Sequence, residues 1–86
     1  MMNYKIIWKT KALKQAKALP ADDRAKVSRA VGQLEQRENW KQVKQLTNHQ
    51  YDYRLRVGRY RVLFNCEEEI KIVRIEEVKK RDERTY

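Results

Sequence analysis

The chain has 86 residues, a length typical of one small domain, and its 21 Lys and Arg residues outnumber 12 Asp and Glu residues. The resulting charge of +9 favours a protein that binds nucleic acid or another polyanion. A single cysteine excludes an intrachain disulfide, and no apolar run reaches the length of a signal sequence or a membrane span. We therefore expect a single cytoplasmic domain over residues 1–86 that binds no membrane.

The first half of the chain predicts one strand followed by two helices. Residues 3–9 alternate between apolar and basic side chains, as a strand does. A helix is expected over Lys11–Leu19 with Thr10 as its N-cap, and Pro20 then interrupts the pattern. A second helix is expected from Ala21 to Glu38. Its core-facing stripe, spaced as i, i+3, i+4 and i+7, consists of Val27, Ala30, Val31 and Leu34.

The second half predicts a meander of three strands. Residues 39–50 read as a polar connection, and two strands within Tyr51–Phe64 are joined at Val57–Gly58–Arg59. A turn over Asn65–Glu69 then leads to the last strand, Ile70–Val78. We expect an α+β fold in which two helices, paired as an αα-hairpin, pack on a small, mostly antiparallel four-stranded sheet. The first strand is expected beside the last, and the order is β-α-α-β-β-β.

The hairpin within Tyr51–Phe64 carries the most specific pattern in the chain. Strand side chains alternate with a period of two, so the hairpin has one apolar face and one basic face. Guanidinium groups packed this closely repel one another unless an anion lies among them. The basic face is therefore a candidate platform for RNA phosphates, formed by Arg54, Arg56, Arg59 and Arg61.

The order of elements, the phrase YRLRVGRYRVLF and the closing KKRDERTY resemble the RelE branch of the RelE/ParE toxin superfamily. The resemblance implies a cytoplasmic toxin of a type II toxin–antitoxin system. Such toxins are endoribonucleases that use no metal or other cofactor and cleave mRNA in the ribosomal A site. The products are a 2′,3′-cyclic phosphate and a 5′-OH. The implied partners are the ribosome, mRNA and an antitoxin, for which a protein of charge +9 suggests an acidic, partly disordered chain.

The resemblance also assigns roles to individual residues. Arg54 and Arg56 occupy the basic strand that carries two lysines in the best-known member of the family. Arg61 matches the arginine of the family's G-x-Y-R-like phrase, Arg81 matches the arginine after the last strand, and Tyr86 matches an aromatic residue that stacks on a base. We expect Arg61 and Arg81 to clamp the scissile phosphate. Further RNA contacts are expected from Lys44, Arg59, Lys79, Lys80 and Arg84.

Several alternatives stay open at this stage. Arg56 replaces the lysine proposed as general base, and a pKa above about 12 makes proton abstraction by arginine difficult at neutral pH. The general base and acid are thus unassigned, and Lys80 or Arg84 is an alternative to Arg81 as the clamp. The rival functions are a ParE-like inhibitor of DNA gyrase and a non-catalytic module that binds RNA or ribosomes. No residues have the spacing of a metal site.

Overall fold

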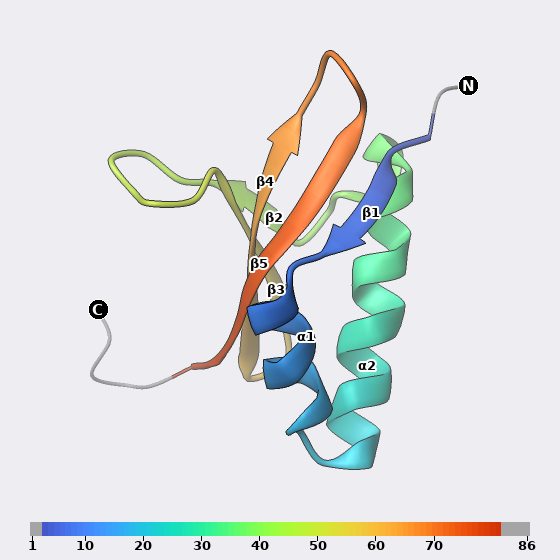
Figure 1. Cartoon of the computed structure of the whole chain (residues 1–86), viewed down its shortest axis with the longest axis vertical. Helices are drawn as coiled ribbons and strands as arrows, with labels where there is room; N and C mark the ends of the chain where they lie inside the picture. Colours follow the sequence, from blue (N-terminus) through green and yellow to red (C-terminus); the bar gives the residue numbers. More distant parts are fainter. Residues whose placement is uncertain (1–2, 82–86) are drawn as a thin grey trace.

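The computed structural model describes residues 3–81, which form two layers (Figure 1). Two helices, α1 (Thr10–Lys17) and α2 (Ala21–Gly32), lie along one face of a five-stranded sheet. Short 3₁₀ helices, η1 (Gln33–Glu35) and η2 (Arg37–Asn39), follow α2. The strands are β1 (Lys5–Trp8), β2 (Val43–Gln45), β3 (Tyr53–Val57), β4 (Tyr60–Glu67) and β5 (Ile72–Lys80).

The sheet is mixed and has the order β1-β5-β4-β3-β2, with β1 parallel to β5 and the other pairs antiparallel. The expected pairing of the first strand with the last is confirmed, whereas the expected number of four strands is wrong. The additional strand is β2, which lies in the predicted polar connection and pairs with β3. Its short polar sequence lacks an alternating apolar pattern, and backbone hydrogen bonds hold it at the sheet edge.

The helix boundaries also differ from the prediction. α1 begins at Thr10 with Lys9 as its N-cap, and α2 ends at Gly32 rather than Glu38. Glycine is a weak helix former, and beyond it the carbonyls find tertiary partners. The indole Nε1 of Trp40 donates to the Leu34 carbonyl at 2.9 Å, so this carbonyl does not need the next helical turn.

The hydrophobic core lies between the helices and the sheet. The central strands supply Val62, Phe64 and Ile75, all fully buried, and α2 supplies Val27 and Val31. Apolar burial is the main favourable term in folding, so this face accounts for most of the stability. Ring packing extends the core toward the end of α2, where Trp40 lies 5.4 Å, centroid to centroid, from each of Tyr4, Tyr53 and Phe64.

The β4–β5 hairpin contains a bulge that changes which side chains face the helices. Leu63 pairs with Glu77, but Phe64 pairs with Ile75, so Glu76 is an extra residue in β5. Glu77 therefore lies on the helix-free face with Leu63. The turn of this hairpin also comes later than expected, after Glu67, and leaves Ile70 56% exposed.

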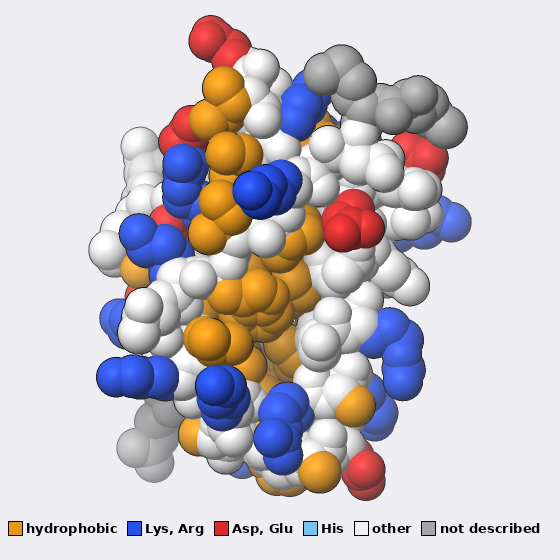
Figure 2. Space-filling model, turned by 45° about the vertical axis from the view of Figure 1, so that its right-hand side comes forward, with side chains coloured by type: hydrophobic (Ala, Val, Ile, Leu, Met, Phe, Trp, Pro, Cys, Tyr) orange, Lys and Arg blue, Asp and Glu red, His pale blue; other side chains and the backbone are white. Residues whose placement is uncertain are grey.

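The side that carries β1 and α2 has an uncovered apolar strip. Figure 2 shows hydrophobic side chains gathered down the middle of this side, with Lys and Arg side chains around them. None of the helices within residues 3–81 has the length and apolar character needed to cross a membrane.

Candidate functional site

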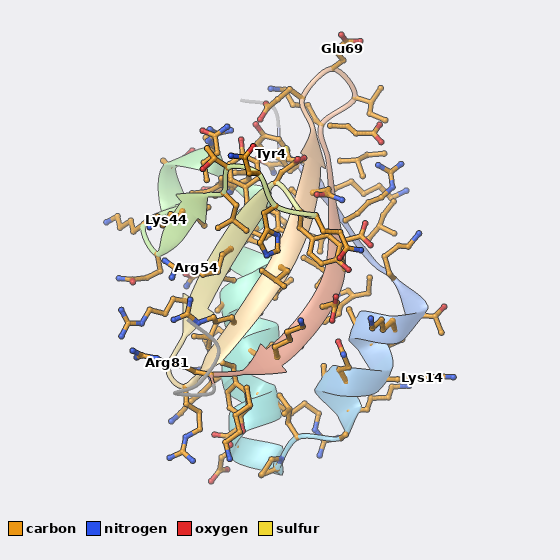
Figure 3. The ribbon with its side chains drawn as sticks, turned by 90° about the vertical axis from the view of Figure 1, so that its left-hand side faces the viewer. Tyr4, Lys14, Lys44, Arg54, Glu69 and Arg81 are labelled. Carbon is orange, nitrogen blue, oxygen red and sulfur yellow. The ribbon has the colours of Figure 1, made fainter. Side chains whose placement is uncertain are left out.

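Strand register gathers basic residues on the helix-free face of the sheet. Arg56 of β3 pairs with Arg61 of β4, which in turn pairs with Lys79 of β5. In the next row, Lys44 of β2 pairs with Arg54 of β3. Directly paired residues project to the same side of a sheet, so all five side chains share one surface. We call this surface the cationic face, defined as Lys44, Arg54, Arg56, Arg61 and Lys79; Figure 3 looks onto it, with Lys44 and Arg54 labelled.

The arginines of the cationic face differ in exposure. Arg54 and Arg61 are half-buried, whereas Arg56 is exposed. Partial burial lowers the effective dielectric around a charge and strengthens its interaction with an anion. The half-buried pair is therefore best placed to hold a phosphate in a fixed position, and Arg56 is free to reach outward.

The end of the cationic face is formed by the β3–β4 turn and the residue after β5. Gly58 adopts a φ of 56°, a left-handed conformation that favours glycine, and allows the tight turn. The Arg81 N–H then donates to the Arg59 carbonyl at 2.5 Å, which extends the sheet ladder by one step. Arg59 and Arg81 therefore lie side by side at this end, and both are exposed.

The structure places Lys80 differently from the other predicted basic residues of the sheet. Lys80 pairs with Tyr60 and alternates with Lys79, so its side chain leaves from the helix-covered side of β5. We therefore do not include Lys80 in the cationic face. Arg84 and Tyr86 lie outside the described residues.

A buried carboxylate borders the cationic face. Glu77, displaced to this side by the bulge, is only 6% exposed. It accepts a hydrogen bond from the Tyr51 hydroxyl at 2.6 Å and forms ion pairs with Lys11 at 3.4 Å and Lys79 at 3.8 Å. Burial tends to raise its pKa, but the Tyr51 hydrogen bond and the two lysines outweigh burial and lower the pKa. Glu77 is therefore ionised at neutral pH and anchors Lys79.

The same contact acts on the tyrosine. The hydrogen bond to Glu77, together with burial, raises the pKa of Tyr51 to about 12, so the phenol stays protonated. Tyr51 also donates its backbone N–H to Nδ1 of His49 at 3.1 Å. His49 is exposed and lies in the loop before β3. The titratable side chains of Glu77, Tyr51 and His49 thus lie at the border of the cationic face, which itself consists of lysines and arginines.

An open hollow of about 480 Å³ lies at the end of the sheet, between α2 and the β3–β4 turn. The Tyr60 hydroxyl crosses its wall and donates to Oδ2 of Asp23 at 2.7 Å. This hydrogen bond, with burial, raises the pKa of Tyr60. We call this site the turn hollow, defined as Asp23, Lys26, Val57, Gly58, Arg59, Tyr60 and Arg81. A second hollow of about 350 Å³, beside Arg56, is lined by Ala30, Gln33, Asn39, Lys41, Gln42, Leu55 and Arg56.

Sequence reasoning missed two of these features. The position of Glu77 follows from the bulge, whose only sequence signal is the interrupted alternation of Val73, Ile75 and Val78. The turn hollow depends on a contact between Asp23 and Tyr60, which are 37 positions apart. Within residues 3–81, no three His, Cys, Asp or Glu side chains are grouped so that they could hold a metal ion.

No family model and no curated protein matches this sequence. Solved structures do match: the RelBE2 toxin–antitoxin complex of Mycobacterium tuberculosis has a TM-score of 0.78 at 28% identity, covering 93% of this chain and 100% of the matched one. The RelE–RelB complex of Pyrococcus horikoshii has a TM-score of 0.76 at 26% identity, covering 95% and 99%. The chain has the RelE toxin fold.

A mutant of the Escherichia coli toxin RelE in the free state shows the same fold, with a TM-score of 0.75 at 18% identity over 92% of this chain and 84% of the other. The described RelE-like chain thus matches both free and antitoxin-bound relatives over nearly its whole length. The sequence resemblance to RelE toxins is confirmed at the level of the fold.

Proposed function

We propose that this RelE-like chain is the toxin of a type II toxin–antitoxin system and cleaves mRNA in the ribosomal A site. The single observation that carries the proposal is the cationic face, which lies on the helix-free side of a RelE fold (Figure 3). A surface with so many cations matches a phosphate backbone better than an uncharged substrate. The protein would act in the cytoplasm, where ribosomes are found.

The proposed reaction is an internal phosphoryl transfer. The 2′-oxygen of the ribose attacks the adjacent phosphorus, the bond from phosphorus to the 5′-oxygen breaks, and a 2′,3′-cyclic phosphate and a 5′-OH result. Charge accumulates on the phosphorane oxygens in the transition state. Arg61 and Arg81 hold these oxygens, because a guanidinium offers paired donors and a permanent charge. The reaction as proposed uses no metal ion.

The remaining basic residues position the RNA. Arg54 and Arg56 neutralise the scissile and flanking phosphates, and Lys44, Arg59 and Lys79 extend the basic surface on either side. We keep Tyr86 as the residue that stacks on a splayed base, a contact worth about 1–3 kcal/mol. Arg84 remains a candidate for RNA contact and an alternative to Arg81 as the clamp, whereas the side chain of Lys80 leaves β5 on the opposite side of the sheet from Arg61.

Proton transfer explains a dependence on the ribosome. The 2′-OH must lose a proton and the departing 5′-oxygen must gain one, yet Arg56 is a poor base. A ribosomal RNA group, or a substrate conformation imposed by the ribosome, completes the site. Purified protein should therefore cut free RNA slowly.

We also propose an antitoxin partner, because the matched structure from M. tuberculosis is a toxin–antitoxin complex and that from P. horikoshii is a RelE–RelB complex. A charge of +9 favours an acidic partner, and the apolar strip of Figure 2 offers a surface for its hydrophobic side chains.

A cell-free translation reaction tests the function. The protein is added to the reaction, and the ends of the mRNA are mapped by primer extension. Cuts within the codon at the A site, absent with the Arg61→Ala variant, are expected. Intact mRNA together with inhibited gyrase supercoiling would instead indicate a ParE-like target, and ribosome binding without cleavage would indicate a non-catalytic module.

A further inference from the structure

We propose that the turn hollow binds a phosphate of the single-stranded RNA that flanks the scissile phosphate, with Lys26 of α2 as a binding residue. This inference rests on the proposed function and extends the RNA path beyond the sheet. Lys26 is exposed and lies midway along a helix, where its simplest interpretation is a solvated surface residue. Its place in the hollow distinguishes it from other surface lysines.

The charges around the hollow carry the argument. Lys26, Arg59 and Arg81 reach it from three separate segments: α2, the β3–β4 turn and the residue after β5. The backbone hydrogen bond from Arg81 to Arg59 keeps the last two together. Three cations that converge on one open hollow repel each other, and a bound phosphate removes that repulsion.

Among the described residues that line the hollow, Asp23 supplies the carboxylate, and this carboxylate already accepts a hydrogen bond. Oδ2 of Asp23 accepts the hydrogen bond of Tyr60, whose ring is buried at 6% exposure. Asp23 is therefore held in place by a rigid neighbour and offsets only part of the positive charge. Within residues 3–81 the lining of the hollow is therefore net cationic, while Val57 and Tyr60 supply apolar surface for a ribose or base.

Continuity with the cationic face favours RNA over an acidic peptide. Arg81 lines the hollow and also lies at the end of the face, two residues after Lys79, the partner of Arg61. Figure 3, which looks onto the helix-free face, shows Arg54 and Arg81 along the same edge of the molecule. A strand clamped by Arg61 and Arg81 therefore continues into the hollow. A volume of about 480 Å³ falls in the size range of small-ligand sites.

The test measures binding without cleavage. The probe is a short fluorescein-labelled oligouridylate with 2′-O-methyl groups, which cannot supply the nucleophile, and its affinity is measured by fluorescence anisotropy over a salt series. Lys26→Gln should weaken binding about two- to fivefold, the effect of one exposed ion pair. It should also reduce the salt slope by about 0.7, the value for one phosphate contact in single strands. The matched control is Lys14→Gln on α1, which Figure 3 shows pointing away from Arg81.

A second variant changes affinity in the opposite direction. Asp23→Asn removes a repelling charge but keeps an oxygen that accepts from Tyr60, so binding should tighten. Asp22→Asn is its control, because Asp22 lies in the same first turn of α2 but does not line the hollow. The control also accounts for the loss of a favourable charge at the helix N-terminus.

The results separate this inference from the proposed function. Equal affinities and salt slopes for Lys26→Gln and Lys14→Gln would refute RNA binding by the turn hollow and would not affect the proposal of mRNA cleavage. Wild-type protein that fails to bind the probe at low salt would also overturn it. Polyglutamate binding that is weakened by Lys26→Gln, with RNA binding unchanged, would assign the hollow to an acidic protein instead. The expected RNA result in a protein that cuts no mRNA would support the hollow and refute the nuclease.

Discussion

The two faces of the sheet use the same strands for different purposes. On the helix-covered face, β4 presents Val62 and Phe64, which are fully buried. On the helix-free face, the same strand presents Arg61, with Arg56 and Lys79 on its two neighbours. Apolar burial stabilises the fold, whereas clustered cations cost electrostatic free energy. The first face therefore explains why the chain folds, and the second contains charges that folding does not require.

The helix-free face also has a small buried part of its own. Tyr51, Leu63 and Glu77 are buried there, outside the main hydrophobic cluster. Among the described residues, Glu77 is the charged residue with the greatest burial. The contrast between the faces is thus one of degree, because the helix-free face includes a buried polar contact, in which Glu77 accepts from Tyr51 and pairs with Lys79. Substitutions on each face should separate stability from activity.

The largest expected effect is on stability, at Phe64. Phe64→Ala removes a fully buried ring that packs against Trp40 and Tyr53. It should lower the free energy of unfolding by about 3–5 kcal/mol, a large part of the total for a small domain. Urea denaturation followed by circular dichroism measures the change. A loss below about 1 kcal/mol would contradict the assignment of this face as the core.

The next largest effect is on activity, at Arg61. Arg61→Ala should slow ribosome-dependent mRNA cleavage by about 10²–10³-fold, the usual effect of removing a donor that stabilises transition-state charge. Its urea midpoint should change little. Single-turnover kinetics with saturating programmed ribosomes measure the rate. An unchanged rate with weaker binding would mean that Arg61 docks the substrate and does not act on the transition state.

Arg74→Ala is the matched control for this experiment. Arg74 pairs with Asn65 on the helix-free face beyond the bulge, and it forms an ion pair with Glu67. It shares residue type and face with Arg61 but lies outside the cationic face. Its removal should leave the cleavage rate within about twofold of wild type, because Arg74 lies outside the cationic face. The fold should also persist, since a surface ion pair contributes little to stability.

The sequence predicts much of the fold because the central strands alternate clearly. Within Tyr53–Phe64 the period-two pattern separates apolar from basic side chains, and strand register preserves that separation in the structure. The sequence did not predict β2, because this strand is defined by backbone hydrogen bonds to β3 and has no alternating side-chain pattern. The sequence did not predict the bulge at Glu76 either, because one extra residue causes only a local break in the alternation of apolar side chains.

The site divides in the same way. Strand alternation predicts which basic residues share a face, since that depends on neighbours in sequence. The turn hollow and the buried Glu77 depend on long-range contacts: Tyr60 reaches Asp23 on α2, and Tyr51 reaches Glu77 across the sheet. No local pattern encodes such contacts. The functional proposal for the cationic face therefore began in the sequence, whereas that for Lys26 required the structure.

A smaller effect tests the polar contact on the helix-free face. Tyr51→Phe leaves the buried carboxylate of Glu77 without its hydroxyl donor, which should cost about 1–3 kcal/mol of stability. Tyr60→Phe is the comparison, since it removes a similar hydrogen bond from Asp23, which is half-buried and lies at an open hollow. Water can replace that donor, so the loss should be smaller. Equal losses in urea denaturation would show that Glu77 is solvated despite its burial.

The smallest expected effect is the pH dependence that Glu68 adds to stability. The hydrogen bond from Tyr4 has the largest effect on Glu68. Together with hydrogen bonds from Cys66 and Arg37, it lowers the pKa of Glu68 to about 2. The unfolded chain, with an ordinary carboxyl pKa near 4.5, takes up this proton first. The contribution of Glu68 to the free energy of unfolding is therefore present above pH 4.5 and is lost as the pH falls toward about 2. Because half of the Glu68 side chain is exposed, the loss should stay below about 1 kcal/mol.

Thermal unfolding between about pH 6 and pH 2 should be less pH-dependent in Glu68→Gln than in Glu69→Gln, a change at the neighbouring carboxylate of the same turn. Identical slopes for the two variants would show that the contacts of Glu68 do not persist in solution.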